Sequence, residues 1–351
     1  MTLSDSAPVL AVWVSPWVAN DGVFQADHPE NRDDEYYGAR VLRQLMEAKG
    51  WRVHTHDVVQ RMGLKPKALL FFDLPRKPVI QLVADWAQEA DLYAMLVESP
   101  LVRPYLWEEA RHKPFKAMFT WHSDLIGRPG YVEVGVGNKL DRDITLKRDL
   151  VGREKLCVLI AGNKRPRISS PLDLYAKRLE CIRWFEAHHP GDFDLYGVGW
   201  NDASIRYSAR LRRMGLMGLV NRLLGAEKHP CWRGPIKEKI PVLERYRFNI
   251  AFENVRDIPG YVTEKIFDSF LGSTVPVYWG APNVTDFIPK DCFIDFRDYG
   301  TFEKLYARLS TMPDDEYLGY LDRIEAFLRS PAADPFRADM VVAIIARQIA
   351  G

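Results

Sequence analysis

The sequence has few cysteines, and none of them belongs to a CxxC pair. Cys157, Cys181, Cys231 and Cys292 are scattered singly along the chain. Zinc sites and the disulfide frameworks of small secreted domains need closely spaced or numerous cysteines, so the pattern argues against both. We therefore expect four buried free thiols in a reducing cytosol.

The sequence also lacks a long hydrophobic run and an excess of either charge. No stretch reaches the roughly 18 apolar residues that a membrane-spanning helix needs, and no basic segment precedes the first apolar run, as a secretory signal would require. Lys and Arg number 48 and Asp and Glu 47, a net charge of +1. Such a balance gives no overall attraction to nucleic acid or membrane. We expect a cytoplasmic protein that binds no nucleic acid.

Length and hydrophobic pattern predict a two-domain α/β protein. The 351 residues suffice for two cores. Short apolar runs, beginning with Val9–Trp13, alternate with segments of helical periodicity, as in parallel sheets covered by helices. A charged stretch ends where a new apolar run begins at Lys155, so we place the boundary after residue 154. The second domain then covers 155–330, and a last helix within 331–351 could cross back to the first.

The stretch Phe248–Gly280 reads as a buried strand, a polar loop, an amphipathic helix and a second buried strand. In a parallel sheet the edge where the first strand ends is the edge that binds ligands. A helix N-terminus with the nearby Lys265 would hold a phosphate there. The alternative is an ordinary helix start, in which Thr263 caps the helix and Glu264 complements its dipole.

Three motifs in this stretch carry a family resemblance: Phe-Glu-Asn at 252–254, Tyr-Val-Thr-Glu-Lys at 261–265 and Val-Pro-Val at 275–277. Together they resemble the donor-binding signature of the α-1,3/4-fucosyltransferases, glycosyltransferase family 10. Further motifs between about residues 155 and 299 follow the family's order. The resemblance implies two Rossmann-like domains that face a cleft, the GT-B arrangement, with C-terminal helices. The absence of a long apolar run makes the soluble bacterial members the nearest match.

The resemblance implies transfer of L-fucose from GDP-fucose to a glycan hydroxyl, α-1,3 or α-1,4, with inversion at the anomeric carbon. This transfer needs a base for the hydroxyl proton and cations for the departing diphosphate. By match, the donor-site residues are Arg178 and Lys265 at the diphosphate, Glu264 at the ribose or fucose hydroxyls, Tyr261 and Asn254 at the nucleotide, and Glu253 as a lesser candidate. Asn163, which follows a strand, is a further donor-site candidate, with loop capping as its alternative.

Glu98 is our candidate for the catalytic base. It follows the apolar run 91–96 and precedes a Ser-Pro break, which places it at the ligand edge of the first domain, and the family carries a glutamate in this region. The alternative is a simple turn residue. Asp124 is the rival base, and it lies with His122 after a neighbouring predicted strand. Both polar clusters would line a cleft.

No metal site is evident, and no cofactor is expected beyond the donor substrate. Metal-dependent enzymes of this kind usually carry an Asp-x-Asp pair at the end of a strand, whereas Asp192 and Asp194 begin one. We interpret Asp194 as structural. A divalent metal could still stimulate activity without being a catalytic ligand.

The segment 206–228 is basic and amphipathic, with six Lys or Arg residues against one acid, Glu227. Such a segment can lie on an anionic membrane and lead the enzyme to lipid-linked or lipopolysaccharide acceptors. The alternative is a solvated insertion that packs on the body of the protein. Two other functions stay open, namely a transferase for another GDP-linked sugar and a nucleotide-sugar-binding module without turnover.

Overall fold

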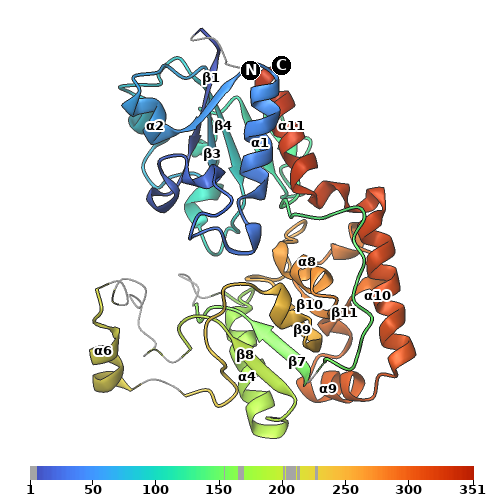
Figure 1. Cartoon of the computed structure of the whole chain (residues 1–351). Helices are drawn as coiled ribbons and strands as arrows, with labels where there is room; N and C mark the ends of the chain where they lie inside the picture. The colour runs from blue at the N-terminus through green and yellow to red at the C-terminus, as the bar shows by residue number, and fades with distance from the viewer. Residues whose placement is uncertain are drawn as a thin grey trace.

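The computed structural model describes residues 6–153, 155–164, 170–200, 202, 211, 214–225 and 228–351. Each half of the chain forms one parallel sheet with helices packed against it (Figure 1). The predicted α/β class is therefore correct. All four cysteines are buried and free. Among the residues that the structure describes, no helix is both long enough and apolar enough to cross a bilayer.

The first sheet has the strand order β2-β1-β3-β4-β5-β6, and every pair is parallel. Its strands are β1 (Val9–Trp13), β2 (Arg52–Thr55), β3 (Ala68–Phe72), β4 (Asp91–Leu96), β5 (Ala117–Thr120) and β6 (Tyr131–Glu133). The helices of this half are α1 (Tyr37–Ala48), α2 (His56–Arg61) and α3 (Val79–Val83). The central strands are continuous apolar runs because helices and loops bury both faces of the sheet.

The second sheet has the order β11-β10-β9-β7-β8 and is also parallel throughout. Its strands are β7 (Lys155–Ile160), β8 (Phe193–Tyr196), β9 (Tyr246–Phe252), β10 (Val275–Trp279) and β11 (Ile294–Asp295). The helices are α4 (Tyr175–His188), α6 (Met217–Leu224), α7 (Ile240–Leu243), α8 (Glu264–Leu271), α9 (Phe302–Ser310) and α10 (Asp314–Arg329). The stretch 248–280 folds as the predicted strand, loop, helix and strand, with β9 and β10 side by side.

The last helix, α11 (Ala338–Ala350), belongs spatially to the first half of the molecule. Its residues Val341, Val342 and Ile345 join the core that surrounds β1, and Figure 1 shows α11 beside α1. Arg337, at the start of this crossing, is 1% exposed and donates to the backbone oxygen of Leu140 at 2.6 Å. The chain therefore passes twice between the two halves, and a buried arginine ties the two passages together.

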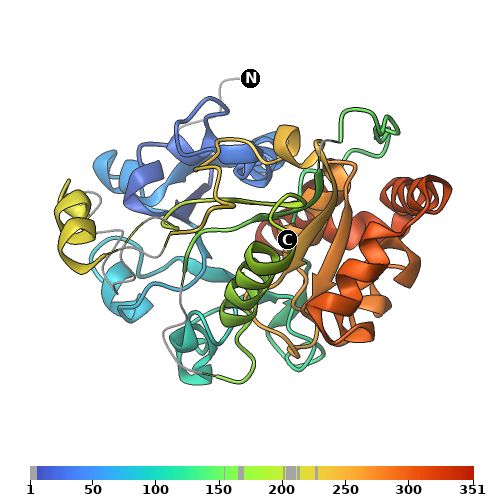
Figure 2. The ribbon, with the colours of Figure 1, turned by 90° about the horizontal axis from the view of Figure 1, so that it is seen from below.

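Helix α6 lies apart from both sheets in two perpendicular views (Figures 1 and 2). It belongs to the basic segment predicted over 206–228, of which residues 206–210, 212–213 and 226–227 lie outside the described residues. Among its described residues, Leu216, Leu219 and Leu223 are 41%, 58% and 73% exposed. This part of the segment therefore carries an apolar face that the rest of the described chain does not cover.

Candidate active site

The two halves of the molecule touch where the ends of β4 and β5 meet the loop after β9. The ring of Tyr261 in this loop packs against that of Trp121 at a tilt of 49°, with ring centroids 4.8 Å apart. At Gly260 the backbone adopts φ of +83°, and a Cβ atom there would lie 2.2 Å from the backbone oxygen of Trp121. Only glycine permits so close an approach at this φ. The predicted ligand edges of the two halves therefore face each other.

Glu98 lies at this junction, and its carboxylate is held from one side. Its Oε1 accepts from the backbone N–H of Ser99 at 2.9 Å and from the hydroxyl of Tyr261 at 3.0 Å. No hydrogen bond from the described part of the chain reaches Oε2. Glu98 therefore lies against the second half of the molecule, with one carboxylate oxygen fixed and the other available.

Asp73 supports the backbone around Glu98, and the sequence analysis missed it. Its Oδ1 accepts from the N–H groups of Val97 at 2.8 Å and Glu98 at 3.3 Å, and Arg103 pairs with Oδ2 at 2.8 Å. Burial raises the pKa of Asp73, although these partners oppose the shift. The available signal was its position directly after the apolar run of β3, at the same sheet edge as Glu98.

Lys265 forms an ion pair with a buried carboxylate in the loop that follows β9. Glu253 is fully buried and lies 3.1 Å from Nζ of Lys265. It also accepts from the N–H of Thr263 at 2.8 Å and from its hydroxyl at 2.7 Å. The alternative in which Thr263 caps α8 is therefore wrong in this detail: Thr263 occupies the N-cap position but makes no side-chain cap, because its hydroxyl donates to Glu253. Burial raises the pKa of Glu253, against the attraction of Lys265.

Arg178 is a buried cation that no described carboxylate contacts as an ion pair, although Glu253 and Glu264 attract it electrostatically. Arg178 is 5% exposed, and no described carboxylate oxygen lies within 4.0 Å of its guanidinium nitrogens, the limit for an ion pair. Nη2 donates to the backbone oxygen of Phe252 at 2.6 Å and to Oδ1 of Asn254 at 3.1 Å. Burial lowers the pKa of Arg178. A cation in this position is costly unless an anion binds beside it.

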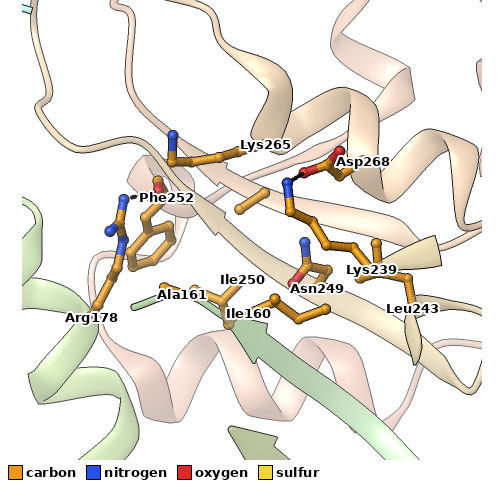
Figure 3. A pocket seen from close by; sticks show the side chains of 11 residues that line it. Ile160, Ala161, Arg178, Lys239, Leu243, Asn249, Ile250, Phe252, Lys265 and Asp268 are labelled. Atoms are coloured by element: carbon orange, nitrogen blue, oxygen red, sulfur yellow. Dashed lines mark hydrogen bonds and ion pairs between the residues drawn. The ribbon is translucent and has the colours of Figure 1, made fainter. Parts of the chain in front are cut away.

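Arg178 and Lys265 line one pocket, flanking the end of β9 (Figure 3). Lys239 also lines it and pairs with Asp268 at 2.8 Å. Burial raises the pKa of Asp268 to about 6, although Lys239 opposes the shift. The pocket has a volume of about 30 Å³, room for water molecules but not for a nucleotide. A nucleotide would therefore lie along its opening and present its phosphates to the two cations.

Glu264 lies beside Lys265, with its side chain 46% exposed. Desolvation favours the neutral form of the Glu264 carboxyl, but the positive charges of Lys265 and Lys239 outweigh it and lower the pKa of Glu264. Glu264 is therefore an anionic acceptor of hydrogen bonds next to Lys265. Glu35 of the first half interacts electrostatically with Glu264 and Lys239, and its pKa is raised, chiefly by burial.

The other predicted site residues lie outside this constellation. Asn163 donates from Nδ2 to the backbone oxygen of Gly199 at 3.1 Å, which ties two loops together. Asp124 is exposed and has no side-chain contact to the second half among the described residues. His122 stacks on Trp121 with centroids 5.4 Å apart, and burial lowers its pKa.

Asp192 and Asp194, the two acids of the Asp-x-Asp pair, accept hydrogen bonds from other side chains. Asp194 accepts from Lys155 at 2.8 Å, Arg233 at 2.6 Å and Tyr246 at 2.6 Å, and Asp192 accepts from a tyrosine hydroxyl at 2.7 Å. These bonds give Asp194 a structural role. Within the described ranges no group of three or more His, Cys, Asp or Glu residues is arranged to hold a metal ion.

Comparison with known proteins identifies the second half. Residues 221–329 match the family description "Glycosyltransferase family 10 (fucosyltransferase) C-term". Residues 221–329 are a glycosyltransferase family 10 domain. The family 10 domain includes the strand and loop that supply Asn254, Tyr261 and Lys265, whereas Arg178 and Glu98 lie outside the matched range.

Curated relatives match over a short stretch. The α-(1,3)-fucosyltransferase FucT of Helicobacter pylori is 44% identical over 70 residues, which cover 20% of this chain and 14% of the relative. An Arabidopsis thaliana α-(1,4)-fucosyltransferase is 38% identical over 73 residues, 21% of this chain and 18% of the relative. The similarity thus spans less than a fifth of the length of either relative.

Solved structures match over nearly the whole chain at low identity. The crystal structure of an α1,3-fucosyltransferase has a TM-score of 0.51 and 17% identity, and covers 92% of this chain and 83% of its own. Anabaena HepE in complex with UDP and glucose has a TM-score of 0.54 and 12% identity, and covers 97% of this chain and 98% of its own. These matches show the GT-B fold, with two parallel α/β sheets.

Proposed function

We propose that the protein transfers L-fucose from GDP-fucose to a glycan hydroxyl. The observation that carries the proposal is Arg178, a nearly buried guanidinium with no ion pair to a described carboxylate, placed beside Lys265 at the end of β9. Two cations at such a point suit a diphosphate, whose negative charge grows as it leaves the sugar. The match of residues 221–329 to a fucosyltransferase family supports fucose as the sugar.

Glu98 acts as the base in this proposal. Because Oε1 already accepts two hydrogen bonds, Oε2 is the oxygen that takes the proton of the acceptor hydroxyl. The base belongs to one half of the molecule and the cations to the other, so the acceptor oxygen and the diphosphate lie on opposite sides of the anomeric carbon. Attack from the side opposite the leaving group inverts that carbon. Glu264, beside Lys265, accepts hydrogen bonds from ribose or fucose hydroxyls in this proposal.

Arg178 and Lys265 stabilise the negative charge of the leaving diphosphate in this proposal, so we propose that no bound metal is needed. Turnover should then persist after dialysis against EDTA, with at most a modest stimulation by Mg²⁺ or Mn²⁺. Loss of all activity on chelation, restored by one metal, would contradict this part of the proposal.

The donor is tested by a turnover screen. We expect the purified protein to release GDP from GDP-fucose in the presence of a suitable glycan, and to be less active with GDP-mannose and UDP-sugars. The screen should use a panel of galactose- and N-acetylglucosamine-containing acceptors. A clear preference for another nucleotide sugar would replace fucose by that sugar, and binding of GDP-fucose without any turnover would favour a binding module.

We further propose that α6 brings the enzyme to lipid-linked or lipopolysaccharide acceptors at an anionic membrane. Leu216, Leu219 and Leu223 lie on one face at helical spacing and are exposed. The other side of the helix contacts the protein, since Met217 is 6% exposed. Cosedimentation with phosphatidylglycerol vesicles should exceed that with phosphatidylcholine vesicles and be lost when Leu219 and Leu223 are both replaced by serine. Equal sedimentation of the variant would show that α6 does not bind lipid.

A further inference from the structure

Tyr261 has a contact that its expected role at the nucleotide does not explain. Its hydroxyl donates to Oε1 of Glu98, across the junction between the halves, at 3.0 Å. The residue is 2% exposed, and its ring is fixed against Trp121. Since a phenol has one proton to donate, that proton is committed to the carboxylate of the proposed base.

The contact is the last step of a chain of hydrogen bonds that starts at the cationic site. Arg178 donates to Oδ1 of Asn254 at 3.1 Å, and Nδ2 of Asn254 donates to the hydroxyl of Tyr261 at 3.4 Å. Tyr261 then donates to Glu98, so every donor points in the same direction, from a buried cation to a carboxylate. Bonds aligned in this way polarise and strengthen one another.

We propose that Tyr261 is a positioning residue for Glu98, and that Asn254 and Arg178 link this positioning to the donor site. The inference rests on the proposed function, because it needs Glu98 as base. The two bonds to Oε1 stop the carboxylate from rotating and leave Oε2 directed to the acceptor. Burial and nearby negative charge raise the pKa of Tyr261 well above its usual value, so the phenol stays protonated and serves as donor.

The test is the variant Tyr261→Phe, which keeps the ring against Trp121 and removes only the hydroxyl. We expect kcat for transfer to fall by about 10- to 100-fold, a share of the contribution of general-base catalysis, while the Kd of GDP measured by calorimetry stays within about twofold. In the Glu98→Gln background the same change should lower kcat by less than about twofold, because the group that it positions is already lost. The matched control is Tyr306→Phe, which removes a tyrosine-to-aspartate hydrogen bond of 2.7 Å far along the chain.

Three outcomes would overturn the inference. A large rise in the Kd of GDP with kcat retained would make Tyr261 a nucleotide contact, as the family resemblance implies. An equal loss of kcat with and without Glu98 would show that its hydroxyl acts independently of the base. A wild-type protein that binds GDP-fucose but never turns it over would overturn the proposed function as well, which distinguishes that failure from the other two.

Discussion

Replacing Arg178 with methionine tests the cationic site, because methionine has a similar length and no charge. The wild-type guanidinium donates to two protein oxygens at 2.6 and 3.1 Å and has no described carboxylate within 4.0 Å. A charge-assisted hydrogen bond is worth about 1.5–3 kcal/mol. Loss of one or two such bonds to a phosphate should therefore weaken GDP binding by about 10- to 10⁴-fold.

The same change should have a smaller effect on the stability of the ligand-free protein. It leaves the backbone oxygen of Phe252 and Oδ1 of Asn254 without this donor, at about 1–3 kcal/mol for each oxygen. It also removes a buried cation, whose desolvation costs several kcal/mol. Because the two effects oppose each other, we expect the free energy of unfolding of Arg178→Met to stay within about 2 kcal/mol of wild type.

Calorimetric titration of GDP and urea unfolding measure the two quantities on the same preparations. Arg183→Met is the matched control, since Arg183 is exposed and lies on the same helix. We expect the control to bind GDP like wild type. If Arg178→Met binds GDP within about twofold of wild type but unfolds far more easily, Arg178 is a structural residue and the reasoning fails.

Two further predictions concern an ion pair within the first half and the close backbone approach between the halves. Asp34 pairs with Lys139 at 2.8 Å, and although burial opposes ionisation, its cationic and amide partners lower its pKa from 3.8 to about 2. A lowered carboxylate pKa gives stability that is complete above the unfolded value and disappears as the pH falls toward the folded value. Urea unfolding should therefore show wild type more stable than Asp34→Asn by up to about 2 kcal/mol near neutral pH, and a difference that stays constant from pH 4 to pH 2 would refute this. Gly260→Ala should lower the unfolding free energy by about 1–3 kcal/mol more than Gly130→Ala, because both glycines have a φ of +83° but only the first meets the backbone of Trp121. Equal losses would show that the close approach is not needed.

The fold followed from the sequence because its strands are apolar on both faces. The runs at β1, β4 and β7 begin and end within a residue or so of their predicted limits. Short strands such as β6 were not predicted, because Tyr131–Glu133 is too short to form an apolar run, although Tyr131 and Val132 pack against the cores of the first half. Hydrophobic periodicity cannot detect a strand that is defined by its neighbour.

The candidate site residues could be named from the sequence, but their contacts could not. The motif around 261–265 pointed to a candidate donor site without showing that Tyr261 reaches the other half to bind Glu98. In the alternative interpretation Thr263 caps α8, whereas its hydroxyl binds Glu253, a partner ten residues earlier that only folding brings close. Asp73 was overlooked because its role is to hold the backbone of another strand end.

The most direct test of the account compares Glu98→Gln with Glu108→Gln, an exposed neighbour. Fucose transfer from GDP-fucose and the Kd of GDP are measured on both variants and on wild type. We predict that Glu98→Gln lowers kcat by about 10²- to 10⁴-fold with GDP affinity unchanged, as loss of a general base requires, and that Glu108→Gln behaves like wild type. Full transfer activity in Glu98→Gln would contradict the account and leave Asp124 as the candidate base.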